Sequence, residues 1–149
     1  MESRDGFHLR KVKCSDIDLL FQWANDSQVR NNAFNTNIIP YEDHKKWFYN
    51  LLQDYDQIQY IFELNDKPIG QIRFVISDNV ALIDYSISYE SRGNGYGRKM
   101  LEMAKDEVIK DRPEIKKLIG QVKKGNDASY KCFTDCGYYE SFTQFELNI

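Results

Sequence analysis

The feature that most restricts the fold of this chain is a glycine-rich segment at residues 92–97, with the sequence Arg-Gly-Asn-Gly-Tyr-Gly. It follows an apolar run typical of a strand and precedes a segment with the apolar spacing of an amphipathic helix. Glycine tolerates positive φ angles, so such a turn can direct successive backbone N–H groups toward an anion at the start of a helix. The segment therefore predicts a strand–loop–helix unit that binds a phosphate or pyrophosphate.

The spacing of the glycines excludes two common phosphate-binding motifs. No Gly-Lys-Ser or Gly-Lys-Thr is present to make a P-loop, and the glycines at 93, 95 and 97 do not fit the G-x-G-x-x-G dinucleotide fingerprint. What remains is the pattern Arg-x-x-Gly-x-Gly, with Arg92, Gly95 and Gly97 at its fixed positions.

Length and composition predict one domain that spans residues 1–149. A chain of 149 residues with 42% hydrophobic residues can bury one substantial core, and it is too short for two comfortable domains. The net charge is −3 and no long block of one charge sign occurs, which argues against nucleic-acid binding. Any bound anion is therefore expected to be held locally.

The cysteines and the N-terminal sequence favour a cytoplasmic protein. Cys14, Cys132 and Cys136 are an odd number without metal-ligand companions, so we expect neither a disulfide framework nor a metal site. The first residues lack the apolar stretch of a signal peptide. No segment approaches the roughly 20 apolar residues that cross a bilayer, so no membrane partner is expected.

Apolar periodicity divides the chain into alternating strands and helices. The expected elements are a strand at 7–12, helices at 17–24 and 41–52, strands at 58–64, 72–76 and 80–89, a helix at 96–108, a strand at 118–123, a helix at 126–136 and one or two strands at 138–149. Residues 25–37 are expected to be a polar connection. The order β-α-α-β-β-β-α-β-α-β(β) predicts a single-domain α/β fold with a mixed, mostly antiparallel sheet flanked by helices.

Two motifs in this order resemble the GNAT superfamily of N-acetyltransferases. The first is Arg92-x-x-Gly95-x-Gly97, and the second, one strand later, is Asn126-x-x-Ser129-Tyr130 followed by Gly137-Tyr138. The resemblance spans nearly the whole chain. It implies the GNAT fold and the direct transfer of an acetyl group from acetyl-coenzyme A to a primary amine.

The resemblance also implies a set of coenzyme A contacts. Backbone amides of the glycine loop would bind the pyrophosphate at the start of the following helix. The strand around Ile87 would offer backbone groups to the pantetheine arm. Asn126 would orient the acetyl arm, cap the following helix or do both, and the Arg92 side chain would contact the cofactor or stay solvated. The expected cofactor-binding residues are Ile87, Arg92, Gly93, Asn94, Gly95, Tyr96, Gly97 and Asn126.

Tyr130 is the predicted general acid. A departing thiolate benefits from a proton donor, and in the family a tyrosine of this helix commonly supplies one; the alternative for Tyr130 is core packing. Asp84 and Glu90 are the candidate general bases for the incoming amine. Asp84 is preferred because it interrupts an apolar run, whereas Glu90 also fits a solvated loop.

Three further side chains have chemical alternatives to packing. His44 can shuttle protons, but its place beside two aromatic residues favours a packed histidine. Cys132 and Cys136 lie on one face of the predicted helix with no histidine nearby in sequence, so packing is expected rather than covalent catalysis.

The two N-terminal helices and their connection, over residues 21–48, are expected to select the acceptor. They resemble the branch that contains ribosomal-protein N-terminal acetyltransferases and bacterial enzymes that acetylate amino sugars on nucleotides. The resemblance implies a small-molecule amine, with an amino-sugar nucleotide as the predicted acceptor. The alternatives are a protein N-terminus, a small polyamine, a non-catalytic acyl-coenzyme A-binding module or a nucleotide-binding regulatory domain. A homodimer is left open.

Overall fold

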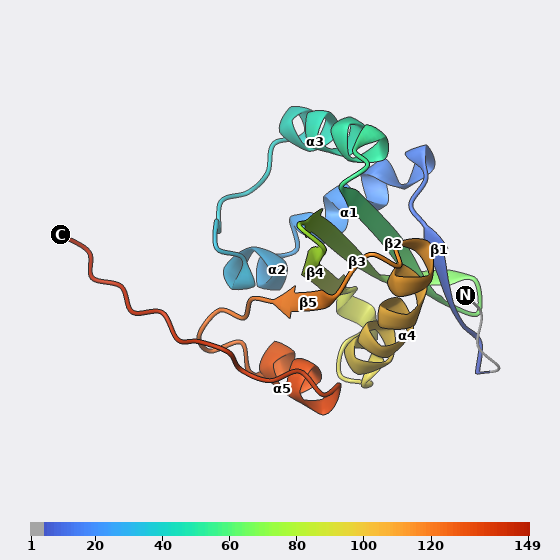
Figure 1. Ribbon diagram of the computed structural model, residues 1–149. Coiled ribbons are helices and arrows are strands. Elements are labelled where there is room, and N and C mark those ends of the chain that lie inside the picture. The colour runs from blue at the N-terminus through green and yellow to red at the C-terminus, as the bar shows by residue number, and fades with distance from the viewer. Residues whose placement is uncertain (1–4) are drawn as a thin grey trace.

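The computed structural model describes residues 5–149, which form one mixed sheet with helices on both faces (Figure 1). The five strands lie in the order β1-β2-β3-β4-β5, which is also their order along the chain. The strands are β1 (Phe7–Lys11), β2 (Gln57–Leu64), β3 (Lys67–Ser77), β4 (Val80–Ile87) and β5 (Lys117–Gly120). The α-helices are α1 (Ile17–Ala24), α2 (Ser27–Asn32), α3 (Tyr41–Gln53), α4 (Tyr96–Asp111) and α5 (Asp127–Asp135).

Two tight hairpins fix the register of the central strands. Asn65 and Asp66 join β2 to β3, and Asp78 and Asn79 join β3 to β4, all four with φ between 50° and 67°. Two-residue turns with positive φ match the twist of antiparallel strands, and Asn and Asp tolerate that conformation. Strands β1 to β4 are consequently antiparallel neighbours, and β5 pairs in parallel with β4.

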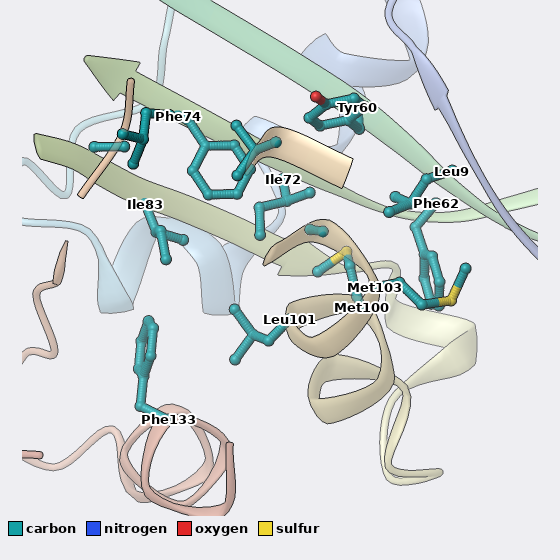
Figure 2. Packing of buried hydrophobic residues seen from close by; sticks show 14 of the residues in the cluster. Leu9, Tyr60, Phe62, Ile72, Phe74, Ile83, Met100, Leu101, Met103 and Phe133 are labelled. Carbon is teal, nitrogen blue, oxygen red and sulfur yellow. The ribbon is translucent and has the colours of Figure 1, made fainter. Parts of the chain in front are cut away.

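The face of the sheet covered by α4 and α5 holds the larger apolar core. Figure 2 shows Met100 and Leu101 of α4 and Phe133 of α5 directed toward the side chains of the strands. Tyr60 donates its hydroxyl to Asp111 at 2.6 Å, so its polar end is satisfied at the edge of this core. We call this side of the sheet the apolar face.

The opposite face is covered by α1 and α3 and is much more polar. Among the described residues, its cluster of fully buried apolar side chains consists of Leu20, Phe48, Leu51 and Ile61. Beside this cluster the strands carry hydrogen-bonded polar residues, among them Gln59, which donates to Gln71 at 2.8 Å. We call this side the polar face.

Strands β4 and β5 separate beyond the pair Ile83 and Gly120. Phe133 packs directly against Gly120 at this point, because a Cβ built on Gly120 would lie 2.1 Å from its ring. From residue 84 to residue 87, β4 continues paired with β3 but no longer with β5. The sheet therefore opens immediately before the glycine loop.

Two expectations about secondary structure were wrong. Residues 27–32 form the short helix α2, because Asp26 accepts hydrogen bonds from the amides of Gln28 and Val29 and caps a polar turn that shows no apolar period. Residues 138–149 form no strand within the chain, since a strand requires a partner and this segment pairs with none of the described strands.

Within residues 5–149, no helix combines the length and apolar composition needed to cross a membrane. No group of three or more His, Cys, Asp or Glu side chains in the same residues is arranged to hold a metal ion.

Candidate active site

The glycine loop adopts the conformation that its composition predicts. Gly93 and Gly95 have φ of 80° and 76°, and Gly95 is the left-handed N-cap of α4. A Cβ at either position would meet nothing within 4 Å, so glycine is required there by its torsion angle and not by crowding. Because Gly95 has no side chain to cap α4, the first-turn amides of a 16-residue helix point at the site for an anion.

The other loop residues build this backbone arrangement. Asn94 donates its side-chain amide to the carbonyls of Ser91 and Arg92 at 3.0 and 3.2 Å, which holds the turn closed. Tyr96 packs edge-on against Phe7 with ring centroids 5.4 Å apart. The loop thus offers main-chain groups to a ligand while its side chains face the protein.

Gly97 allows α4 and α5 to approach closely. A Cβ at this position would lie 3.2 Å from the Cys132 sulfur. Gly97 therefore combines a first-turn amide with a packing role that its place in the motif did not reveal.

Arg92 extends from the loop toward α2. Its guanidinium donates to Asp26 at 2.9 Å, to Gln28 at 3.2 Å and to the carbonyl of Ile87 at 3.0 Å. Burial alone would raise the pKa of Asp26, but the hydrogen bonds from Arg92 and from the α2 amides hold it below its usual value. Arg92 therefore connects the glycine loop to α2, which lies within the expected acceptor region.

Asn126 occupies the N-cap of α5, as one of its two expected roles requires. Its side-chain oxygen accepts the amide of Ser129 at 3.3 Å. Four residues later, Tyr130 is 49% exposed, and its hydroxyl lies 3.3 Å from a carboxylate oxygen of Glu140. Tyr130 is therefore not a core residue.

Tyr85 is a second hydroxyl near the opening of the sheet, and sequence reasoning missed it. It extends from β4 and donates to the Ser129 hydroxyl at 2.9 Å. Burial raises the pKa of Tyr85 well above the ordinary tyrosine value, and contact with Cys132 adds to the shift. The alternation along β4, which places Ile83, Tyr85 and Ile87 on one face, is the signal that would have located it.

A pocket of about 220 Å³ lies where α1, α2, the end of β4 and the glycine loop meet. Its lining residues are Gln22, Trp23, Asp26, Val29, Ser86, Ile87, Tyr89, Glu90 and Arg92. Ile87 and Arg92 thus belong both to this pocket and to the expected cofactor site. The pocket has one cation, which Asp26 already pairs, and a second carboxylate at Glu90.

The two candidate bases occupy different places. Glu90 lines the pocket from the 3₁₀ turn Tyr89–Ser91. Asp84 lies outside the pocket lining, with its side chain 61% exposed and 3.9 Å from Arg73. Ser86, two residues along the same strand, does line the pocket, so Asp84 is close to it along the polar face.

His44, Cys132 and Cys136 are packed. His44 is 2% exposed, hydrogen-bonded to the carbonyl of Ile17 at 2.9 Å and surrounded by aromatic rings. Cys132 and Cys136 pack against the apolar core, and burial raises the pKa of the Cys136 thiol. These positions match the packing roles that the sequence favours.

A glycine loop at a helix N-terminus, beside a pair of parallel strands that separate, is an arrangement that suits a pyrophosphate ligand with an extended arm. Residues 7–139 match the sequence profile of the acetyltransferase (GNAT) domain, and the chain therefore belongs to this family of acetyltransferases. Membership makes it an N-acetyltransferase whose acetyl donor is acetyl-coenzyme A. No curated protein sequence matches the chain significantly.

Solved structures share the fold at low sequence identity. Spermidine N-acetyltransferase from Vibrio cholerae, in complex with coenzyme A and spermine, has a TM-score of 0.85 at 18% identity, over 96% of this chain and 88% of that one. Aminoglycoside acetyltransferase AAC(6')-Ib with ribostamycin and coenzyme A gives 0.79 at 22%, over 92% and 85%. The ribosomal L7/L12 N-terminal acetyltransferase RimL with coenzyme A gives 0.77 at 18%, over 92% and 81%.

Proposed function

We propose that this chain transfers the acetyl group of acetyl-coenzyme A directly to the primary amine of a small acceptor bound in the 220 Å³ pocket. The observation that carries the proposal is the meeting of two sites at Ile87 and Arg92. These residues lie between the glycine loop, which suits a pyrophosphate, and the acidic pocket, which suits a cationic amine. Bound acetyl-coenzyme A supplies the activated acyl group.

The backbone of the chain would hold the donor. Amides of residues 92–97 face the pyrophosphate position, and the edge of β4 at residues 84–87, which β5 leaves open, can accept an extended ligand as an added strand. This arrangement fits the cofactor that the family uses. Arg92 holds the loop in place through Asp26 rather than contacting the ligand with its side chain.

Glu90 is the better placed of the two candidate bases. It lines the acceptor pocket, so it can take a proton from a protonated amine directly or through water, whereas Asp84 requires a path along the polar face. Tyr130 is the proposed acid, because it is exposed in the first turn of α5, the helix whose tyrosine commonly has this role in the family. Tyr85 is a poorer acid, since burial makes its proton harder to release.

The identity of the acceptor rests on the pocket's polar and aromatic lining. Gln22 and Trp23 offer a hydrogen-bonding amide and a ring face, as a sugar acceptor needs, which supports the amino-sugar nucleotide that the sequence predicts. Glu90 gives a specific reason for a second candidate, a polyamine, because a carboxylate attracts a cationic chain, whereas the charge of Asp26 is balanced by Arg92. A nucleotide diphosphate would need to extend out of the pocket to avoid them.

A coupled assay of free coenzyme A thiol tests the proposal. Acetyl-coenzyme A would be combined with spermidine, an aminoglycoside, an amino-sugar nucleotide or a peptide with a free N-terminus, and initial rates compared. We expect release of the coenzyme A thiol with a small-molecule amine. In Glu90→Gln we expect kcat to fall by about 100-fold, and in Asp84→Asn by less. A greater loss in Asp84→Asn would transfer the role of base to that residue.

Ligand binding separates the enzyme from the non-catalytic alternatives. Acetyl-coenzyme A at about 1,000 times its dissociation constant should stabilise the fold by roughly 4 kcal/mol, which a thermal shift detects. Binding without thiol release for any amine would favour an acyl-coenzyme A-binding module. No thermal shift with acetyl-coenzyme A would contradict the proposed donor site and favour another phosphate ligand.

A further inference from the structure

A row of hydrogen-bonded side chains crosses the polar face of the sheet and ends at the pocket. Gln59 of β2 donates to Gln71 of β3 at 2.8 Å, and Gln71 donates to the Ser86 hydroxyl of β4 at 3.2 Å. Gln59 and Gln71 are only 3% and 7% exposed, whereas Ser86 is half-buried and lines the pocket. The row therefore connects two buried amides to a hydroxyl that a ligand can reach.

Asp84 fixes the direction of hydrogen bonding along this row. One of its carboxylate oxygens lies 3.4 Å from the side-chain nitrogen of Gln71, and a carboxylate accepts hydrogen bonds but does not donate them. The opposite orientation of the Gln71 amide would bring its carbonyl oxygen against this carboxylate, which is unfavourable. Gln71 therefore turns its N–H groups toward Asp84 and Ser86, and its carbonyl oxygen toward Gln59.

This orientation determines what the Ser86 hydroxyl offers to a ligand. A serine hydroxyl has one proton to donate and two lone pairs that accept. Because Gln71 donates to one lone pair, the proton of Ser86 is directed away from that amide. Ser86 borders the pocket, so this proton is available to an oxygen atom of a bound ligand.

The pocket thus presents two groups of different character to an acceptor. Ser86 and Glu90 line the same pocket of about 220 Å³. The Glu90 carboxylate attracts an ammonium group, and the Ser86 proton suits an uncharged oxygen close to that group. A polyamine has no such oxygen, whereas an amino sugar or an amino alcohol has a hydroxyl near its amine. The two groups together favour the hydroxylated class of amine.

We propose that Ser86 selects a hydroxylated amine as the acetyl acceptor, by donating a hydrogen bond to a hydroxyl oxygen near the reacting nitrogen. This inference rests on the acetyl transfer proposed above for the same pocket. Gln71 is a positioning residue, since its amide sets the direction of the Ser86 proton. Asp84 in turn sets the direction of that amide, which gives this carboxylate a role other than that of a base.

A matched pair of ring amines tests the selection. The amino alcohol trans-2-aminocyclohexanol carries a hydroxyl beside its amine, and cyclohexylamine lacks it. We expect kcat/KM to be about tenfold higher for the amino alcohol in the wild type, and this preference to fall below about twofold in Ser86→Ala. Ser86→Thr keeps the hydroxyl and should keep the preference, as should the control Ser77→Ala at the exposed end of β3.

Gln71→Met tests the positioning of the hydroxyl. Methionine has a similar length but no amide, so Ser86 keeps its hydroxyl and loses the group that orients it. The preference for the amino alcohol should fall by at least about threefold in a variant that circular dichroism shows to be folded. An unchanged preference in this folded variant would overturn the role of Gln71.

The outcomes distinguish this inference from the function on which it rests. Thiol release with the same preference in wild type and Ser86→Ala, or with spermidine and neither ring amine, would overturn selection by Ser86 and leave acetyl transfer intact. Absence of thiol release with every amine would contradict the proposed function. Calorimetry with the chain saturated by coenzyme A then tests Ser86 by binding alone, and equal affinity for the two ring amines in that complex would overturn the inference.

Discussion

The apolar face under α4 and α5 is packed by a continuous set of buried hydrocarbon side chains, whereas the polar face under α1 and α3 combines a small cluster with hydrogen-bonded charges and amides. Burying polar groups costs free energy unless each one has a partner, so the second arrangement is the more demanding. The apolar face supports the backbone that would hold a donor common to a whole family. The polar face and its pocket carry the groups that would distinguish one acceptor from another.

The largest effect is expected at the polar face, in Arg10→Met. Arg10 bonds Asp16 at 2.8 Å and Glu63 at 3.0 Å, and these carboxylate side chains are only 7% and 11% exposed. Removing the cation leaves two nearly buried negative charges, so we expect a loss of about 3–5 kcal/mol in the free energy of unfolding, measured by urea denaturation. The exposed pair of Arg98 and Glu102 is the control, where Arg98→Met should cost less than about 1 kcal/mol.

The difference in stability between wild type and Arg10→Met should depend on pH. Burial alone would raise the pKa of Asp16, but hydrogen bonds from Arg10 and from the Lys13 amide hold it below the usual value of 3.8. A lowered folded-state pKa contributes stability above the unfolded-state pKa, and that stability is lost as pH falls through the folded-state value. The difference in the free energy of unfolding between wild type and Arg10→Met should therefore become smaller below pH 3.8. A difference that stays constant there would contradict this role of Asp16.

An intermediate effect is expected on the donor side, in Tyr130→Phe. If the hydroxyl protonates the departing thiolate, kcat should fall by about 100-fold while the affinity for coenzyme A, measured by calorimetry, stays unchanged. Tyr139→Phe changes another exposed tyrosine and is the control. If kcat falls in Tyr85→Phe but not in Tyr130→Phe, the buried hydroxyl of Tyr85 would be the group that protonates the thiolate.

The smallest effect is expected where the two sides meet, in Asp26→Asn. Asparagine keeps the cap of α2 but loses the charge that pairs with Arg92. We expect the KM for the acceptor to rise by up to about tenfold, with the KM for acetyl-coenzyme A changed less than about twofold. Lys131→Met, which removes an exposed pair with Asp135, is the control. A larger change in the KM for acetyl-coenzyme A would show that the ion pair serves the donor loop.

The parts of this fold that sequence predicts are those with local causes. The positive φ angles of Gly93 and Gly95, the cap at Asn126 and the alternation of the central strands all depend on neighbouring residues. The direction of Arg92 was not predictable, because its partner Asp26 is 66 residues away in sequence. The alternation at 142–149 predicts a strand, yet the segment pairs with none of the described strands, and the polar helix α2 has a cap without an apolar period.

The torsional requirement at Gly93 and Gly95 has a consequence for how such proteins diverge. A ligand site made of backbone amides and two positive φ angles constrains few side chains, because the space around both glycines is open. Most surrounding positions can then drift over evolutionary time as long as the backbone path is kept. This agrees with a TM-score of 0.85 at 18% identity to a solved structure of the same fold. The path of the backbone is thus shared between chains whose residues have become largely different.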